Sequence, residues 1–284
     1  MIRHRNVQPS TLRHVYRIPL RRFIDHVGDN PQRFDAAGIR AFVLAEAQRV
    51  SPRTAKSSAS AVRQLLRFLS VVGRCRPEII YAVPTIASWR LSSLPTFISS
   101  SDVDRIVAAC DASTASGCRD RAMLLLMARL GLRAGDVASL RLGDVDWAAA
   151  TVTVFGKTRR RSRVPLPQDV GDAILVWLER GRPASQDDHL FLRLLAPIGP
   201  FADGQGVSAR VAKAARRAGV GVPRVGSHVL RHSAATALLG EGMSLPAIGA
   251  LLRHASLETT AIYAKVDVGL LSTVARAWPT EVSS

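Results

Sequence analysis

The chain has 284 residues, long enough for two domains with sizeable cores, and 47% of its residues are hydrophobic, which excludes a disordered polypeptide. Its formal net charge is +17, from 39 Lys and Arg against 22 Asp and Glu, which favours a polyanionic partner such as a nucleic acid. A ribosomal or a membrane-surface protein would have the same charge balance. A GC-rich genome would also produce a chain in which only four of the basic residues are lysine.

The three cysteines follow neither a disulfide pattern nor a zinc-binding pattern. Cys75, Cys110 and Cys118 are odd in number and include no C-x-x-C pair, which indicates a reducing, cytoplasmic compartment. The first residues lead into no apolar signal region, and no uncharged apolar run reaches the roughly 18 residues of a membrane span. We therefore expect a protein that is neither secreted nor membrane-spanning.

Residues 1–92 are predicted to form a small helical domain. Apolar residues at helical spacing predict three helices: 11–27, 34–49 and 52–72. Pro19 is expected to break or kink the first helix, and Ser51 before a proline is a typical N-cap of the third. The apolar residues of the third helix step by four and three and predict one buried stripe: Ala55, Ala59, Val62, Leu66 and Leu69.

The positive charge is concentrated in this first part of the chain. Residues 1–95 carry 16 Lys or Arg against 5 Asp or Glu, whereas the other 189 residues carry 23 against 17. Most charged residues on a helix merely face solvent, but solvation alone does not explain such an asymmetry between two parts of one chain. We therefore expect the N-terminal domain to be the part that clamps DNA.

Residues 93–284 are predicted to form a second domain, mostly helical with one small antiparallel sheet, so the fold class is mainly α. The stretch from Pro84 to Pro95 has the composition of a linker, and Ser101 with Asp104 resembles a capping box. From this capping box we expect a helix to about residue 112, followed by a strongly apolar core helix over 118–130 and a hairpin of strands 151–155 and 163–166. After it we expect a helix over 170–180, a loop-rich stretch over 181–206, a helix over 207–218, and helix from Ser227 nearly to the end.

Five short motifs follow one another in this second domain. They are Leu130-Gly131-Leu132-Arg133 with Asp136, Phe155-Gly156-Lys157, His228-Val229-Leu230-Arg231-His232, Leu252-Arg253-His254, and Thr259-Thr260-Ala261-Ile262-Tyr263. They resemble, in order and spacing, the motifs of the tyrosine recombinases, the phage-integrase and Xer-type family: T-G-L-R-x-x-E/D, a β-hairpin lysine, H-x-L-R-H, L-G-H and T-T-x-x-Y. The resemblance covers about residues 96–275, and more loosely the first 95.

The resemblance implies an N-terminal helical core-binding domain of SAM-like fold and a catalytic domain that cleaves and rejoins DNA through a covalent 3′-phosphotyrosine, without metal, ATP or other cofactor. The implied roles are nucleophile for Tyr263, phosphate clamp for Arg133 and Arg231, proton acceptor for His228, proton donor to the leaving 5′-oxygen for Lys157, and donor to a phosphate oxygen for His254. Such a division of labour suits a phenol, which is a poor nucleophile while it is protonated.

Three other positions bear on this site. Arg253 stands where the family usually has glycine, so it either disturbs the turn or adds a phosphate contact. Asp136 is either a simple ion-pair partner or a support for Arg133. His232 is expected to be a structural histidine, hydrogen-bonded within the fold.

The implied partner is double-stranded DNA, bound by a homotetramer in the synaptic complex, with a second recombinase as a further candidate partner and no membrane. The apolar segment 266–278 either docks on a neighbouring subunit or packs on its own domain. Three alternatives stay open: a type IB topoisomerase-like enzyme, a non-catalytic DNA-binding accessory protein, and a metal-dependent nuclease. The sequence leaves the DNA site open, and with it the choice between integration of a mobile element, dimer resolution and cassette exchange.

Overall fold

The computed structural model describes residues 12–87, 96–155, 161–221, 226–254 and 257–266. The chain divides into two compact units, Met1–Ser92 and Ser93–Ser284. Among the described helices, none combines the length and the apolar character that crossing a bilayer requires. The three cysteines are free thiols.

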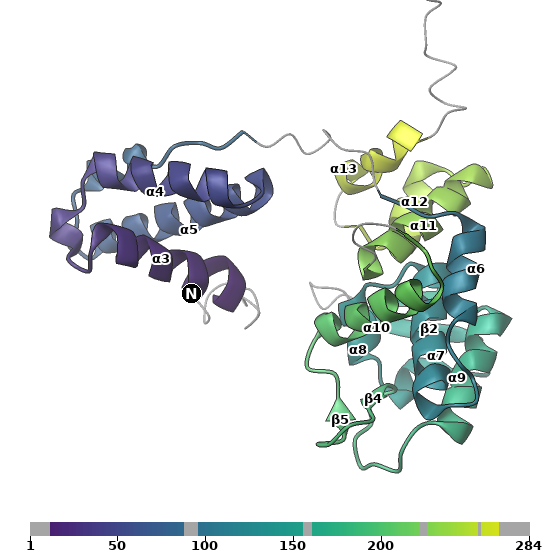
Figure 1. The fold of residues 1–284 in the computed structure, drawn as a ribbon. Coiled ribbons are helices and arrows are strands. Elements are labelled where there is room, and N and C mark those ends of the chain that lie inside the picture. Colours follow the sequence, from purple (N-terminus) through teal and green to yellow (C-terminus); the bar gives the residue numbers. More distant parts are fainter. Residues whose placement is uncertain (1–11, 88–95, 156–160, 222–225, 255–256, 267–284) are drawn as a thin grey trace, which may run out of the picture. The chain divides into compact units, whose positions relative to one another are not determined.

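The described part of the first unit is made of α-helices and shorter helical turns (Figure 1). They enclose a hydrophobic core that includes three phenylalanines. The elements of this unit are η1 (Leu12–Arg17), α3 (Ile18–Val27), η2 (Pro31–Arg33), α4 (Ala36–Arg49), α5 (Pro52–Val71) and η3 (Pro77–Ala82). The ring of Phe23 packs edge-on against Phe34 and Phe42, with centroids 5.5 and 5.3 Å apart. The chain stays helical through this region, so Pro19 does not break it: a π-helical turn ends at Arg17, whose backbone is itself helical, and Pro19 lies in the first turn of α3, where a proline is tolerated.

Helix α5 matches its prediction closely. The hydroxyl of Ser51 accepts a hydrogen bond from the Thr54 N–H at 3.4 Å and caps the helix. Four residues of the predicted stripe are buried, and Leu69 is partly buried against the same core. Helix α4 begins two residues later than predicted, because the carboxylate of Asp35 accepts from the Gly38 N–H at 2.7 Å and so fixes the start at Ala36.

The second unit is built around helix α7, which is buried on almost every side (Figure 1). Its helices are α6 (Ser100–Ala108), α7 (Ala115–Leu130), α8 (Ala134–Ser139), η4 (Leu142–Asp144), α9 (Gln168–Arg180), α10 (Gly204–Arg217), α11 (Ser227–Gly240), α12 (Leu245–Leu251), α13 (Leu257–Thr260) and η5 (Ala261–Val266). The predicted core helix is confirmed, and each fully buried Leu or Met along it stabilises the fold by about 1.5–3 kcal/mol. Helices α9 and α11 pack against α7, and the indole of Trp177 in α9 donates to the Leu190 carbonyl at 2.8 Å.

The described strands of the second unit form two antiparallel sheets. Strands β1 (Val145–Asp146), β2 (Thr151–Phe155) and β3 (Arg161–Pro165) form an antiparallel sheet in the order β1-β2-β3, and β4 (Leu192–Arg193) pairs with β5 (Gly199–Pro200). The predicted hairpin and the small antiparallel sheet are confirmed. The additional pair β4–β5 was not predicted, because two-residue strands are too short to show an alternating pattern.

The start of α6 also differs from the prediction. The N-cap is Ser99, whose hydroxyl accepts from the Asp102 N–H at 3.1 Å, and not Ser101. Residues 99–102 and 101–104 both have the Ser-x-x-Asp spacing of a capping box, and the fold uses the first. The helix also ends earlier than predicted, at Ala108.

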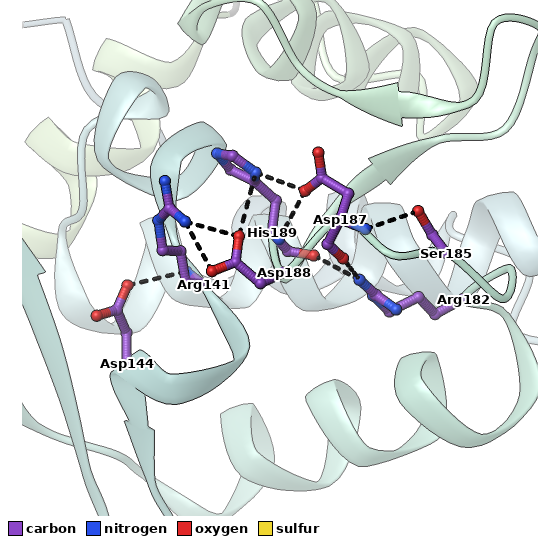
Figure 2. Close-up of polar contacts among 7 residues, drawn as sticks. All are labelled: Arg141, Asp144, Arg182, Ser185, Asp187, Asp188 and His189. Carbon is purple, nitrogen blue, oxygen red and sulfur yellow. Dashed lines mark hydrogen bonds and ion pairs between the residues drawn. The ribbon is translucent and has the colours of Figure 1, made fainter.

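An ion-pair cluster fastens the loop after α9 to the chain segment after α8 (Figure 2). Arg141 donates to both carboxylate oxygens of Asp188, at 2.7 and 2.6 Å, and Nδ1 of His189 lies 2.6 Å from Asp187. Hydrogen bonds from the backbone and the ring of His189 hold the pKa of the Asp187 carboxyl below its usual range. Nη2 of Arg182 also donates hydrogen bonds to the backbone carbonyls of Asp187 and His189. The loop is thereby held at several points.

Replacing Gly117 by alanine is expected to destabilise the second unit. A Cβ at this position would lie 1.8 Å from the carbonyl oxygen of Asp111, a backbone atom that cannot rotate away. We expect the free energy of unfolding to fall by about 2–3 kcal/mol, as for an overpacked core, measured by denaturant titration. Gly135→Ala in α8 is the matched control: its Cβ would meet nothing within 4 Å, and it is expected to stabilise by up to about 1 kcal/mol. Unchanged stability of Gly117→Ala would contradict the close approach.

Candidate active site

Four of the predicted site residues come from three segments that the fold brings together. Arg133 is the N-cap of α8, Arg231 lies in α11, and His254 and Tyr263 follow α12. Hydrogen bonds between segments more than twenty residues apart in sequence connect them. The candidate site is therefore assembled by tertiary packing and not by any one local motif.

The other two predicted site residues are His228 and Lys157. His228 lies in the first turn of α11, and its side chain is exposed. Lys157 lies outside the residues that the structure describes. The strands on either side of it, β2 and β3, form the hairpin in which the sequence analysis expected it.

The guanidinium of Arg231 links the three segments. One terminal nitrogen donates to the carbonyl oxygen of Gly131, and the other donates to the carbonyl oxygen of Leu252. Arg231 is only 5% exposed, and burial, together with the positive charge of Arg133, lowers its pKa to about 10. Arg231 therefore remains a cation at neutral pH, and hydrogen bonds to the two carbonyls replace those that its guanidinium would make to water.

Gly131 permits this close approach. It ends α7 in the left-handed region, with φ of +58°, a conformation that glycine adopts without steric strain. A Cβ at this position would lie 2.3 Å from Cδ2 of Leu252. The glycine of the Leu-Gly-Leu-Arg motif is thus required twice, once to end the helix and once to let Leu252 pack beside it.

Tyr263 lies between two histidine rings. Its hydroxyl is 2.8 Å from Nδ1 of His232, and its ring lies nearly parallel to that of His254, with centroids 6.4 Å apart. The side chain is 1% exposed. Burial raises the pKa of the phenol, and the charge of Arg231 only partly opposes this. The phenol is therefore protonated at neutral pH, and it needs a base to become a nucleophile.

His232 has the protonation state that such a base requires. Burial, with the charges of His228 and Arg231, lowers the pKa of His232, so its ring is neutral at pH 7. In the tautomer that carries the proton on Nε2, Nδ1 accepts the proton of the Tyr263 hydroxyl. The expected internal hydrogen bond of His232 is thus made to Tyr263 itself, whereas the ring of His228 lies 6.5 Å, centroid to centroid, from that of His232.

His254 is also neutral and oriented by a hydrogen bond. Its Nδ1 lies 2.7 Å from the hydroxyl of Thr260, and burial, followed by the charges of Arg231 and Arg133, lowers its pKa to about 4. When the Thr260 hydroxyl donates to Nδ1, the proton of the ring resides on Nε2, which can then donate to a phosphate oxygen. A Cβ on Gly249 would lie 2.8 Å from the Thr260 hydroxyl, so α12 requires a small residue there.

Arg253 and Asp136 form a buried ion pair within the site. Nη2 of Arg253 donates to Oδ2 of Asp136 at 2.8 Å, and the same oxygen accepts from the backbone N–H of Arg133 at 3.1 Å. The carbonyl of Arg253 in turn accepts from Arg133 at 3.4 Å. Asp136 therefore combines the two roles that the sequence left open, ion pairing and support of Arg133. Arg253 has a φ of +54°, a conformation that costs a non-glycine residue about 1–2 kcal/mol and that accounts for the glycine usual in the family.

Two features of this arrangement could not be found from the motifs. His228 and His232 are four residues apart and lie on one face of α11, so either could have contacted the tyrosine. The inward orientation of Arg253 follows from a left-handed turn that sequence would assign to glycine. The sequence feature that could have indicated a special role for Arg253 was its departure from the glycine of the family motif.

The described residues also contain one group of side chains with metal-ligand spacing. Ligand atoms of Asp187, Asp188 and His189 all lie within 4.8 Å of one another. Their contacts, shown in Figure 2, are with Arg141 and with each other. These carboxylates act as ion-pair and hydrogen-bond partners in the loop after α9, and they give no reason to assign a metal to this cluster.

Known proteins resemble this chain in sequence. The model of the phage integrase family matches residues 96–269. An integrase/recombinase-type protein of Sinorhizobium fredii, y4rA, is 42% identical over 87% of this chain and 60% of its own length. The chain thus spans less than two thirds of that relative. The tyrosine recombinase XerC of Oceanobacillus iheyensis is 32% identical over 77% of this chain and 72% of its own.

The fold has known counterparts as well. The crystal structure of the XerH site-specific recombinase bound to palindromic difH substrate superposes with a TM-score of 0.74 at 22% identity, over 95% of this chain and 80% of that chain. The predicted fold class, mainly α with a small antiparallel sheet, is confirmed by this likeness and by the observed elements. Since the family model matches more than half of the sequence, the chain belongs to the phage integrase family of tyrosine recombinases.

Proposed function

We propose that the chain is a site-specific DNA recombinase or integrase that cleaves and rejoins DNA strands through a covalent 3′-phosphotyrosine. The observation that supports this most directly is the Tyr263 hydroxyl, hydrogen-bonded to a neutral histidine beside a buried cation. Attack of the phenol oxygen on phosphorus forms the tyrosine–phosphate bond and breaks the bond to the 5′-oxygen. The energy of the broken ester is kept in the new one, so a 5′-hydroxyl can reverse the step without ATP.

The side chains around Tyr263 divide the work of this step. His232 accepts the phenol proton, and Arg133 with Arg231 binds the non-bridging oxygens of the phosphate. Two donors of Arg231 bind carbonyls, and its remaining N–H groups are left for a phosphate. His254 donates through Nε2, and Lys157 protonates the leaving 5′-oxygen. Each well-placed donor of this kind contributes about 10²–10³ in rate.

The proposed substrate is duplex DNA, gripped by the unit Met1–Ser92 through its arginines and cleaved by the unit Ser93–Ser284. Residues 1–95 contain 16 basic and 5 acidic residues, and this excess of positive charge supports the DNA-gripping role of the first unit. XerH, a site-specific recombinase that shares the fold, has been crystallised bound to palindromic difH substrate. We extend the proposal to a homotetramer on two duplexes, the assembly that strand exchange between partners requires.

The Tyr263→Phe variant is expected to lose covalent adduct formation completely. The substitution removes the attacking oxygen but leaves the ring beside His254. The measurement is trapping, in EDTA, on nicked suicide duplexes tiled from the DNA that flanks the gene, followed by denaturing electrophoresis. An adduct that survives the substitution would place the nucleophile on Tyr16 or Tyr81, the other tyrosines of the chain.

The same assay separates the alternatives. No adduct from the wild-type protein on any duplex would favour a non-catalytic DNA-binding protein. Cleavage that EDTA abolishes would favour a metal-dependent nuclease. Relaxation of supercoiled DNA by monomers, without exchange between duplexes, would favour a type IB topoisomerase-like activity.

The rate of adduct formation is expected to stay constant as the pH falls from 8 to below 6.5. His232 must be neutral to accept the phenol proton, and its lowered pKa means that the neutral form is lost only below the ordinary histidine range. Single-turnover rates across pH measure this. His232→Gln should slow the reaction by about 10²–10⁴-fold. An acid limb at or above pH 6.5, or a larger loss in His228→Gln than in His232→Gln, would assign the proton acceptor elsewhere.

Affinity for a duplex is expected to fall steeply with salt, because the basic helices of the first unit release counterions from the phosphate backbone. A footprint of roughly 6–10 phosphates predicts a loss of about 10³–10⁵ in affinity between 50 and 200 mM salt. Fluorescence anisotropy on a labelled duplex measures the slope. A slope that corresponds to only one or two phosphates would contradict the clamp.

A further inference from the structure

We infer that Arg253 is a third guanidinium of the phosphate-binding site, and that it contacts a non-bridging oxygen of the scissile phosphodiester alongside Arg133 and Arg231. The inference rests on the proposed function, since it names a further contact to the same substrate. It concerns a position where the family motif has glycine, so the contact is an addition that this chain makes to its site.

The first argument is a buried guanidinium with unused donors. The side chain of Arg253 is 9% exposed, and only Nη2 has a partner, the carboxylate of Asp136 at 2.8 Å. Nε and Nη1 are buried and have no hydrogen-bond partner among the described residues. Burying a charged donor without an acceptor is unfavourable, and such groups mark places where an ion or ligand binds.

The second argument is the unbalanced charge around these donors. Burial is the largest cause of the lowered pKa of Arg231 and of Arg253; beyond it, Arg133 and Arg253 lower the pKa of Arg231, and Arg133 lowers that of Arg253, so the three guanidinium groups repel one another. Asp136 offsets one of the three positive charges, which leaves an excess of two. A phosphodiester supplies a negative charge and two non-bridging oxygens, the acceptors that guanidinium groups match.

The third argument is the backbone at the end of α12. The N–H groups of Arg253 and His254 bond back to the carbonyls of Ala250 and Gly249 at 3.0 and 2.9 Å, and this turn requires the left-handed conformation of Arg253. Glycine would make the same turn without strain. Strained residues of this kind cluster at functional sites, where the side chain has a task that a relaxed residue does not perform.

The unused donors of Arg253 and the Tyr263 side chain are closed to solvent alike. Nε and Nη1 of Arg253 are buried, and Tyr263 is 1% exposed. Leu252, next to Arg253 in the chain, accepts a hydrogen bond from Arg231 through its carbonyl, so Arg253 lies beside a residue that the buried guanidinium holds.

The test compares Arg253→Gly with the wild type on two suicide duplexes, one with an ordinary scissile phosphodiester and one with a methylphosphonate at that position. The methylphosphonate lacks the negative charge that Arg253 neutralises. We expect Arg253→Gly to form the adduct about 10²-fold more slowly than the wild type on the phosphodiester. On one methylphosphonate isomer, the ratio of the two rates should return close to one. Arg253→Lys, which keeps the charge, should lie in between on the phosphodiester.

Arg141→Ala is the matched control, because it removes a guanidinium and its ion pair to Asp188 in the loop cluster of Figure 2. It should cleave both duplexes at the wild-type rate. Arg253→Gly cleaving the phosphodiester at the wild-type rate would overturn the inference. An equal loss on both duplexes would also overturn it, and would make Arg253 a positioning residue that acts through Asp136. A wild-type protein that forms no adduct would refute the proposed function itself.

Discussion

The buried guanidinium of Arg231 is the interaction on which the candidate site depends. A single cation bonds to the end of α7 through Gly131 and to the end of α12 through Leu252, so it fixes the position of Arg133 on one side and of His254 on the other. Taking a guanidinium out of water is costly, and losing one partner of a buried charge typically costs about 3–5 kcal/mol. The two carbonyls therefore belong to the site as much as the side chains do. Gly131 makes the arrangement possible, since any Cβ there would collide with Leu252.

Burial, reinforced by positive charge, explains the protonation states of the histidines in the site. Desolvation is the largest cause of the lowered pKa of both His232 and His254, and the charge of Arg231 acts in the same direction, so both rings are neutral at physiological pH. A neutral histidine can accept a proton from the Tyr263 phenol, which a histidinium cannot do. The charge of Arg231 opposes, only in part, the rise in the pKa of the phenol that burial causes. Under the proposed function, the neutral ring of His232 is therefore the member of the Tyr263–His232 hydrogen bond that is ready for proton transfer.

The sequence predicted those parts of the fold whose signals are local. Periodic apolar residues identified α5 and α7, Ser51 identified a helix start, and β-branched residues identified the β2–β3 hairpin. It did not predict the paired strands of two residues, which are too short for any period, or the choice of Ser99 over Ser101, because both offer the same capping pattern.

In the site, the motifs identified the participating residues but not their contacts. The hydrogen bond between His232 and Tyr263 spans 31 positions and depends on how α11 packs against η5. The role of Asp136 likewise depends on Arg253, which is 117 residues away in the chain. Only tertiary packing determines such pairs. A sequence motif therefore identifies candidate residues but does not predict which of them contact one another.

The side chains of Tyr263 and Arg231 in the candidate site are closed to solvent in the observed conformation. Tyr263 is buried, and two donors of Arg231 are taken by carbonyls. The described elements that follow His254 are a four-residue helix and a 3₁₀ turn, which have few internal hydrogen bonds, so local opening of these two elements costs less than opening of α7 or α11. Under the proposed function, a phosphodiester would offset the repulsion among the arginines, and its binding would favour whichever arrangement admits it. The same binding would then supply the free energy that exposes Tyr263.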